Sequence, residues 1–311
     1  MLSRERPERL KGPRTADSVV AAVRERLGSG ELDMPVDTVG RWAALAALGR
    51  TDLALARVAE GHVDAVAILA EAGRGVAPGA LYGVWASRSG GASVRLVDGR
   101  VSGTMRYCSG AGGIDRALVV AGDSLVEVDL ADPAVVPDRA SWQAIGMDAS
   151  ASADVRFEGV AGTVVGSPGW YASRAGFLVG GGGVAAVWLG GAAGVLDDVL
   201  DLLAEREPDE HQLAHVGALH AAVEGAAGYL ERVAHSIDDG DVRPVQLATC
   251  RTVAERAAWE TLDRVPRVVG PTPLSRDRVF AQRLVDLQLY VRQHHAERDL
   301  AALGRAVLEA R

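Results

Sequence analysis

The sequence predicts an α+β protein with an N-terminal helical domain, a central antiparallel β-barrel or sandwich, and a C-terminal antiparallel helix bundle. The spacing of apolar residues changes twice along the 311 residues and divides the chain into three parts. Apolar residues recur at helical spacing up to about residue 79, short alternating runs follow, and helical spacing returns after residue 167. We therefore expect three domains, at residues 1–79, 80–167 and 168–311.

The first domain carries helix patterns with clear start and stop signals. Segments such as SVVAAVRERL, TVGRWAALAAL and GHVDAVAILAEAG have apolar residues at helical intervals. Pro35 and Asp52 mark helix starts, whereas Gly49 and Gly73 mark helix ends. Residues 1–14 are charged and lack the apolar core of a signal peptide, so we expect a disordered leader on a cytoplasmic protein.

The central domain consists of short β-branched and alternating runs. These are LYGVWAS, SVRLV, RVSGTMRYC, RALVVA, SLVEVDL, ADVRFEGV and GTVVG. Turn signals such as Asp98-Gly99, Gly122-Asp123 and Asp132-Pro133 separate them. Because no helical pattern lies between the runs, an antiparallel barrel or sandwich is favoured over βαβ units.

The last domain is helical, with breaks near Glu207-Pro208, Asp239-Gly240 and Gly270-Pro271. Four or five long helices with short connections are typical of an antiparallel bundle. The stretch 177–196, FLVGGGGVAAVWLGGAAGVL, is uncharged and long enough to cross a bilayer. Its seven glycines and its amphipathic continuation favour a helix buried in the bundle, so we expect no membrane partner.

Composition excludes several classes of partner and site. The formal net charge of -8, with basic residues interleaved with acids, argues against nucleic acid and anionic membranes. Cys108 and Cys250 are far apart and form neither a disulfide framework nor a zinc spacing. His211 and His215 stand at i, i+4, but no third ligand accompanies them, so no metal site is predicted.

Specific motifs then point to one family. In the central domain these are Val101-Ser102-Gly103, Tyr107-Cys108-Ser109, Trp142 with Gly146-Met147, and GMDASASADVRFEGV over 146–160. Together they resemble the middle domain of the acyl-CoA dehydrogenase superfamily. The stretch 270–294 also resembles, without a gap, the family segment that runs from a Gly-Gly loop to the catalytic Glu. The resemblance covers most of the chain from about residue 52.

The resemblance implies a flavoprotein that binds FAD. It assigns the hydroxyl of Ser109 to the flavin N5 region and packs Tyr107 against the isoalloxazine ring. Trp142, Arg206 and Gly270 fall on further cofactor-binding positions, with Arg206 as a phosphate contact. His294 takes the place of the catalytic Glu, and an imidazole can accept a proton near neutral pH.

Two of these residues also have ordinary structural interpretations. Ser109 could simply begin the turn Ser-Gly-Ala-Gly-Gly. His294 could be an ordinary helix residue paired with a carboxylate such as Glu297. Because His294 and His295 are adjacent, their side chains would diverge on a helix, and we expect His294 to be the one that faces the flavin.

Several family motifs are altered. Residues 85–90, WASRSG, replace the family's T-E-P-x-x-G-S-D segment, and the Gly-Gly loop keeps only Gly270. The Arg-x-x-Phe-Gly segment that would reach a neighbouring subunit's FAD has become 206–210, REPDE. The N-terminal helical unit is also shorter than is usual in the family.

These features leave three functions to be separated. The first is a FAD-dependent oxidoreductase that acts on CH-CH groups of an acyl thioester or another small molecule and passes electrons to an electron-transferring flavoprotein. The second is a two-component flavin monooxygenase that takes reduced flavin from a reductase. The third is a non-catalytic family member that serves as a scaffold. The resemblance also implies a homodimer or homotetramer.

Overall fold

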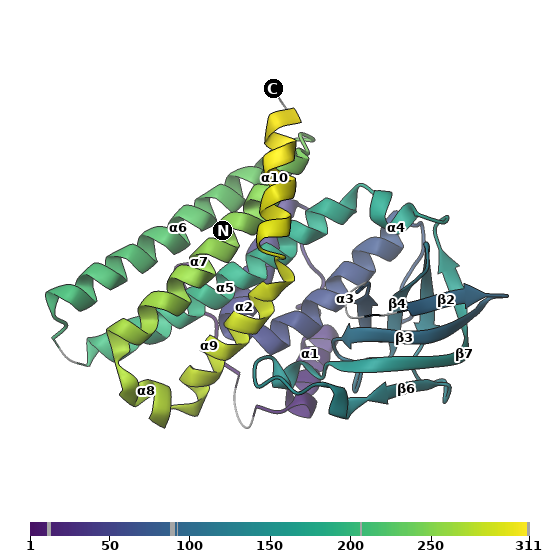
Figure 1. The fold of residues 1–311 in the computed structure, drawn as a ribbon, viewed down its shortest axis with the longest axis horizontal. Coiled ribbons are helices and arrows are strands. Elements are labelled where there is room, and N and C mark those ends of the chain that lie inside the picture. The colour runs from purple at the N-terminus through teal and green to yellow at the C-terminus, as the bar shows by residue number, and fades with distance from the viewer. Residues whose placement is uncertain (11–13, 88–90, 92, 206, 310–311) are drawn as a thin grey trace.

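The computed structural model describes residues 1–10, 14–87, 91, 93–205 and 207–309. Helices come first, a sheet follows and helices return, which is the predicted order (Figure 1). The sheet lies at one end of the molecule and the long C-terminal helices at the other. The predicted α+β class is therefore confirmed.

The N-terminal helices begin at side chains that cap them. They are α1 (Ala16–Ser29), α2 (Thr38–Thr51) and α3 (Leu53–Glu71). Thr15 and Ser18 form a capping box on α1, and Asp37 caps α2. Asp52 separates α2 from α3, because its backbone is extended and its carboxylate accepts a hydrogen bond from the Leu55 amide at 2.9 Å.

The seven described strands form one curled, mixed sheet. They are β1 (Tyr82–Trp85), β2 (Ser93–Val97), β3 (Arg100–Cys108), β4 (Arg116–Ala121), β5 (Ser124–Asp129), β6 (Val135–Asp138) and β7 (Ala153–Val165). The order is β1-β4-β5-β7-β3-β2, and β6 also pairs with β7. The long β7 strand therefore joins both halves of the sheet.

Two details of the sheet differ from the sequence expectation. The strands β1 and β4 pair in parallel, because the β2-β3 hairpin lies between them in the chain and returns it in the same direction. The strand β6 was not predicted, since it is short and contains Pro137. Proline is tolerated there because β6 pairs only with β7 among the described strands.

The C-terminal half forms the helix bundle. Its helices are α4 (Trp170–Ser173), α5 (Gly176–Ala204), α6 (Glu210–Asp238), α7 (Pro244–Val269), α8 (Pro271–Arg276), α9 (Arg278–Tyr290) and α10 (Glu297–Glu309). By length and composition α5 could cross a membrane, but 72% of its apolar 18-residue window is buried inside the protein. It packs against α2, α6 and α7, as a core helix of a bundle does.

Glycine allows α2 and α5 to approach closely. A Cβ atom added to Gly190 on α5 would lie 2.0 Å from the Ala46 carbonyl oxygen on α2. In return, a Cβ atom on Gly49 of α2 would lie 2.2 Å from the Val187 carbonyl oxygen. Neither backbone can give way without moving its whole helix, so both positions require glycine.

The helix α3 lies between the sheet and the bundle (Figure 1). Leu55 and Val58 belong to the core shared with the sheet, whereas Leu53 and Ala56 belong to the core of the bundle. A third face of α3 carries charged residues instead. This arrangement places polar groups of α3 at the junction of the two halves.

The start of the chain lies against the bundle, whereas the sequence predicts a disordered leader over residues 1–14. The Met1 amino group pairs with Glu231 at 3.0 Å. Arg6 pairs with Asp197 at 3.2 Å, and Arg9 pairs with Asp198. The charged leader is thus paired with carboxylates on α5 and α6, a long-range pairing that composition cannot reveal.

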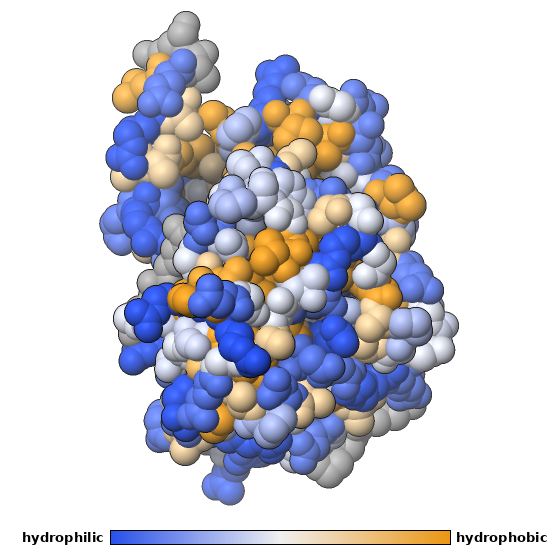
Figure 2. Space-filling model, turned by 90° about the vertical axis from the view of Figure 1, so that its right-hand side faces the viewer, coloured by the Kyte–Doolittle hydropathy of each residue, from blue (hydrophilic) through white to orange (hydrophobic). Residues whose placement is uncertain are grey.

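The last helix, α10, projects from the body of the protein (Figure 1). Seen from the sheet end, it rises at the upper left, and hydrophilic residues with scattered apolar patches cover the face below (Figure 2). None of the described α10 residues is buried, although the helix contacts α7.

Replacing Gly190 with alanine tests the close approach of α2 and α5. We expect Gly190→Ala to lower the free energy of unfolding by about 1–3 kcal/mol, because the new methyl group overlaps backbone atoms of α2. Gly217→Ala is the matched control, since a Cβ atom there meets nothing within 4 Å. It should stabilise α6 by about 0.5–1 kcal/mol. Chemical denaturation measures both, and an equal effect of the two changes would contradict the packing argument.

Candidate active site

A cavity of about 420 Å³ lies where the starts of α5 and α7 meet α10. Its size is within the usual range for small-molecule sites. Apolar side chains make up much of the wall, including Phe177, Leu178, Val184 and Leu247. The charged and titratable groups that line it are Asp64, Tyr171, Arg174, Arg251, His294 and Asp299.

His294 is the predicted catalytic residue, and it lines this cavity. The residue is only 2% exposed, and neither ring nitrogen has a hydrogen-bond partner among the described residues. Burial lowers the pKa of its imidazole, so the ring is neutral at pH 7. A neutral imidazole offers one donor and one acceptor, which is what a proton-transfer group needs.

His295 is placed differently. Its side chain is exposed, and its ring nitrogen lies 3.4 Å from Asp299. The α9 helix ends at Tyr290, and a short 3-10 turn, Val291–Gln293, leads to His294, where the backbone is extended. Only His294 turns inward, and the two side chains are separated by a break in the helix and not by divergence along one helix. Glu297 is not a hydrogen-bond partner of His294.

A charged stripe on α3 faces the same region. It consists of Arg57, Glu60, Asp64 and Glu71, and Arg174 from the α4-α5 connection packs against it. Arg57 pairs with Glu60, and Arg174 lies 3.1 Å from Glu71 and 3.7 Å from Asp64. Burial, together with Glu60, raises the pKa of Asp64 to about 6.

Ser109 lies at the other end of this stripe. Its hydroxyl accepts a hydrogen bond from Arg57 Nε at 3.1 Å and lies 3.3 Å from the Ser152 hydroxyl. The same Arg57-Glu60 pair lies beside Tyr290, and both residues influence the pKa of its hydroxyl, which burial raises. Since Tyr290 precedes His294 by four residues, the Arg57-Glu60 pair lies between the end of β3 and the segment that carries His294.

The remaining predicted cofactor residues lie in different places. Tyr107 lies one residue before the end of β3, with a left-handed backbone, φ 60°, and is 53% exposed. Trp142 is partly buried against the bundle core, and its indole donates to the Gly146 carbonyl at 3.3 Å. Gly270 ends α7, roughly 30 Å along that helix from the cavity, at 1.5 Å per residue. Arg206 lies outside the described residues.

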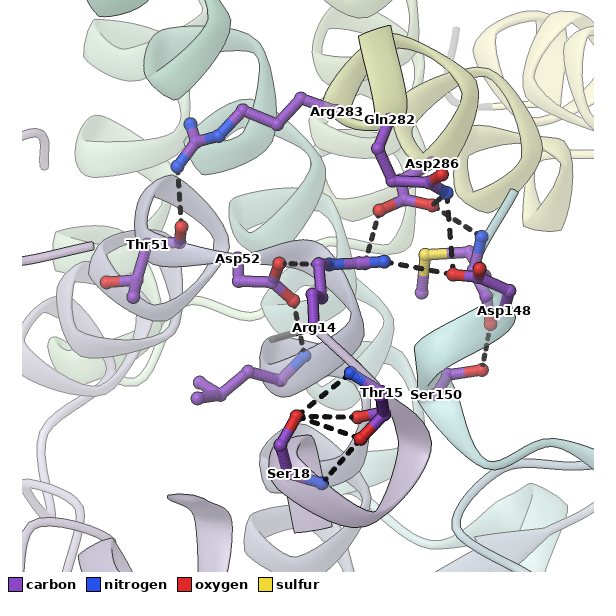
Figure 3. Close-up of polar contacts among 12 residues, drawn as sticks. Arg14, Thr15, Ser18, Thr51, Asp52, Asp148, Ser150, Gln282, Arg283 and Asp286 are labelled. Carbon is purple, nitrogen blue, oxygen red and sulfur yellow. Dashed lines mark hydrogen bonds and ion pairs between the residues drawn. The ribbon is translucent and has the colours of Figure 1, made fainter. Parts of the chain in front are cut away.

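Arg14 anchors the helix that leads to His294. Its guanidinium pairs with Asp52 at 2.6 Å, with Asp148 at 2.9 Å and with Asp286 (Figure 3). Asp286 is 2% exposed and also accepts hydrogen bonds from the Met147 amide and from Gln282. Burial raises the pKa of Asp286 to about 6, even though Arg14 favours its ionised form.

Comparison with known proteins agrees with this architecture. Residues 167–291 match the profile of the acyl-CoA dehydrogenase C-terminal domain. The C-terminal bundle is therefore similar in sequence to that domain, which is the part of the chain that the profile covers. No curated protein matches the chain significantly.

Solved structures share the fold over nearly the whole chain. The dibenzothiophene monooxygenase TdsC from Paenibacillus sp. A11-2, solved with FMN and indole, is 19% identical with a TM-score of 0.77, and 95% of each chain is covered. Butyryl-CoA dehydrogenase from Megasphaera elsdenii is 16% identical with a TM-score of 0.74, covering 94% of this chain and 90% of that one. Methanesulfinate monooxygenase MsuC from Pseudomonas fluorescens is 16% identical with a TM-score of 0.74, and the match covers 97% of this chain and 98% of that one. The fold thus occurs in both dehydrogenases and monooxygenases.

Replacing Arg14 tests its role as an anchor. We expect Arg14→Met to lower the free energy of unfolding by about 3–5 kcal/mol at pH 7.5, because a buried carboxylate loses its cation. The loss should shrink at pH 5, since Asp286, whose folded pKa is already raised, then becomes protonated and neutral.

Arg24→Met is the control for this substitution. Arg24 pairs with Asp115 at 2.8 Å, but both side chains are 41% exposed. Its loss should cost less than about 1 kcal/mol, with little dependence on pH. Chemical denaturation at the two pH values measures both variants, and equal losses would contradict the anchor.

Proposed function

We propose that the protein is a flavin-dependent monooxygenase whose substrate occupies the cavity and whose proton acceptor is His294. The observation that carries this proposal is the buried, neutral imidazole with no protein partner on either nitrogen. It lies where the resemblance places the carboxylate of a dehydrogenase. The shared fold with TdsC and MsuC supports the same class.

The residues around the end of β3 suit a flavin ring. Ser109 is partly exposed, and its hydroxyl can donate or accept, which fits a ring nitrogen that changes protonation with redox state. Tyr107 stands exposed beside it and provides a flat surface for an aromatic ring. When bound, the flavin would supply the electrons and the reaction with oxygen.

The chain favours FMN over FAD, the cofactor that the resemblance implies. A helix N-terminus is a natural site for a diphosphate, but the Asp209 carboxylate caps α6 by accepting from the Gln212 amide at 2.8 Å. Glu207 and Glu210 add negative charge on either side. These carboxylates would repel the diphosphate of FAD, whereas FMN lacks that group.

The protein's own residues have distinct roles in this proposal. His294 accepts a proton from the substrate, and its burial keeps the imidazole neutral and ready to do so. The apolar walls limit the access of water to the reacting groups. Arg57 holds the Ser109 hydroxyl in place from α3.

A second candidate is oxidation of a CH-CH bond, because Asp64 places a carboxylate in the same cavity. A carboxylate with a pKa near 6 is a suitable base for removing an α-proton. The two functions differ in an anaerobic experiment. A dehydrogenase loses its flavin colour when an acyl-CoA thioester is added, whereas a monooxygenase keeps its oxidised spectrum until a reductase supplies electrons.

The proposal includes a flavin reductase as partner and a homo-oligomer as the working form. Gly270 and residues 207–210 lie at the end of the bundle away from the cavity (Figure 1). A flavin bound beside the cavity would be out of their reach, so any contact they make with flavin would be in a neighbouring copy. Analytical ultracentrifugation of the full chain determines the assembly.

Flavin binding and turnover test the proposed function together. We expect the purified protein to bind FMN more tightly than FAD in a fluorescence titration. With FMN, a flavin reductase, NADH and a panel of small aromatic compounds, it should form an oxygenated product detectable by mass spectrometry. His294→Gln should lower the rate of product formation about 100-fold or more without changing the affinity for FMN.

His295→Gln is the matched control, because that side chain is exposed and is not among the residues that line the cavity. It should leave both the rate and the affinity unchanged. Absence of binding to either flavin would contradict an enzymatic role and support the scaffold function. Bleaching of bound flavin by acyl-CoA would support the dehydrogenase instead.

A further inference from the structure

Asp64 is a cavity residue whose carboxylate has no close hydrogen-bond or ion-pair partner among the described residues. Its side chain is 23% exposed, and it lines the cavity from α3. Within the described part of the chain, its carboxylate forms no hydrogen bond, and its ion pair with Arg174 is long, at 3.7 Å. A carboxylate in such a recess needs a cation or a donor to offset its desolvation.

The arginines around Asp64 are already held by other groups. Arg57 pairs with Glu60, and Arg174 donates to Glu71 at 3.1 Å. Arg41, which borders the same cluster, donates to the Pro35 and Val36 carbonyls. Each of these three guanidinium groups therefore makes its closest contacts with groups other than Asp64.

The cavity's other cation, Arg251, is also occupied. Its guanidinium donates to the Gly181 and Gln293 carbonyls at 3.1 and 3.0 Å and stacks over Trp188 at 4.8 Å. Arg174 keeps a buried Nε without a hydrogen-bond partner among the described residues, but its guanidinium already pairs with the carboxylates of Glu71 and Asp64. A cationic ligand would find the open carboxylate of Asp64.

A second observation shows that the cavity is built for a polar ligand. His294 is 2% exposed, and both of its ring nitrogens lack partners among the described residues. A buried polar group without a partner costs free energy, which a ligand can restore. Phe177, Leu178 and Leu247 provide apolar contacts between these two polar points.

We propose that the cavity binds a small apolar or aromatic molecule that carries a basic amine, whose ammonium group pairs with Asp64. This inference deepens the proposed function and rests on it only for the statement that the bound molecule is a substrate. His294 then contacts another part of the same molecule, where it can accept a proton. Arg174 remains hydrogen-bonded to Glu71, which leaves the Asp64 carboxylate open to the ammonium group.

Three indole compounds that differ in one terminal group test this ligand class. Tryptamine carries an ammonium group, tryptophol a hydroxyl and indole-3-propionate a carboxylate. Their affinities for the full chain are measured by isothermal titration calorimetry at pH 8, with and without FMN. We expect tryptamine to bind at least tenfold more tightly than tryptophol, and indole-3-propionate to bind most weakly.

The substitution Asp64→Asn tests whether the preference for tryptamine over tryptophol depends on the Asp64 carboxylate. It should lower the affinity for tryptamine at least tenfold and leave the affinity for tryptophol unchanged. Asp299→Asn is the matched control, because Asp299 lines the same cavity but its carboxylate already accepts from the His295 amide at 3.1 Å. It should keep the preference for tryptamine.

Several results would overturn the proposal. These are no binding of tryptamine at millimolar concentration, equal binding of the three compounds, tighter binding of indole-3-propionate, or loss of the preference in Asp299→Asn instead of Asp64→Asn. If Asp64→Asn does not fold, the comparison of the three compounds on the unaltered chain still decides. A preference for tryptamine without any flavin binding would sustain the ligand class while removing the proposed oxidoreductase function.

Discussion

Arg14 is the point at which the three parts of the fold are joined. Its guanidinium pairs with Asp52 at the start of α3, with Asp148 before β7, and with Asp286 on α9. Removing such a charge from water is costly, and three carboxylates compensate for it. Because Asp286 also holds the Met147 amide, the sheet and the bundle keep a fixed position relative to each other.

The candidate site depends on this junction. The α9 helix runs from Asp286 to Tyr290, and the turn after it brings His294 into the cavity. From the other side, α3 carries Asp64 to the cavity and Arg57 to Ser109. The strands and the bundle thus meet along one polar face of α3, which is where a cofactor and a substrate could share neighbouring positions.

Much of this architecture could be predicted from the sequence, because hydrophobic period and turn residues are local signals. The strand run RVSGTMRYC and the helix break at Gly270 are examples. His294 was predicted as catalytic through a family motif, and the structure places it in the wall of the cavity. Asp64 and Arg57 were missed, since charges at i, i+3 and i+7 on a helix usually mark a solvated face. The sequence also could not show that Arg14 meets Asp286, because their pairing depends on tertiary contact.

His294 is a buried, neutral imidazole whose two ring nitrogens have no partner among the described residues and are available to a ligand. Nitrogen-15 NMR of the histidine side chains, assigned with His294→Gln, tests both properties most directly. We predict that the His294 ring is mostly neutral at pH 6.5, because burial lowers its pKa, and that its nitrogen shifts change when FMN or a cavity ligand is added. An imidazole that is charged at pH 6.5, or whose shifts stay constant on ligand addition, would contradict the account.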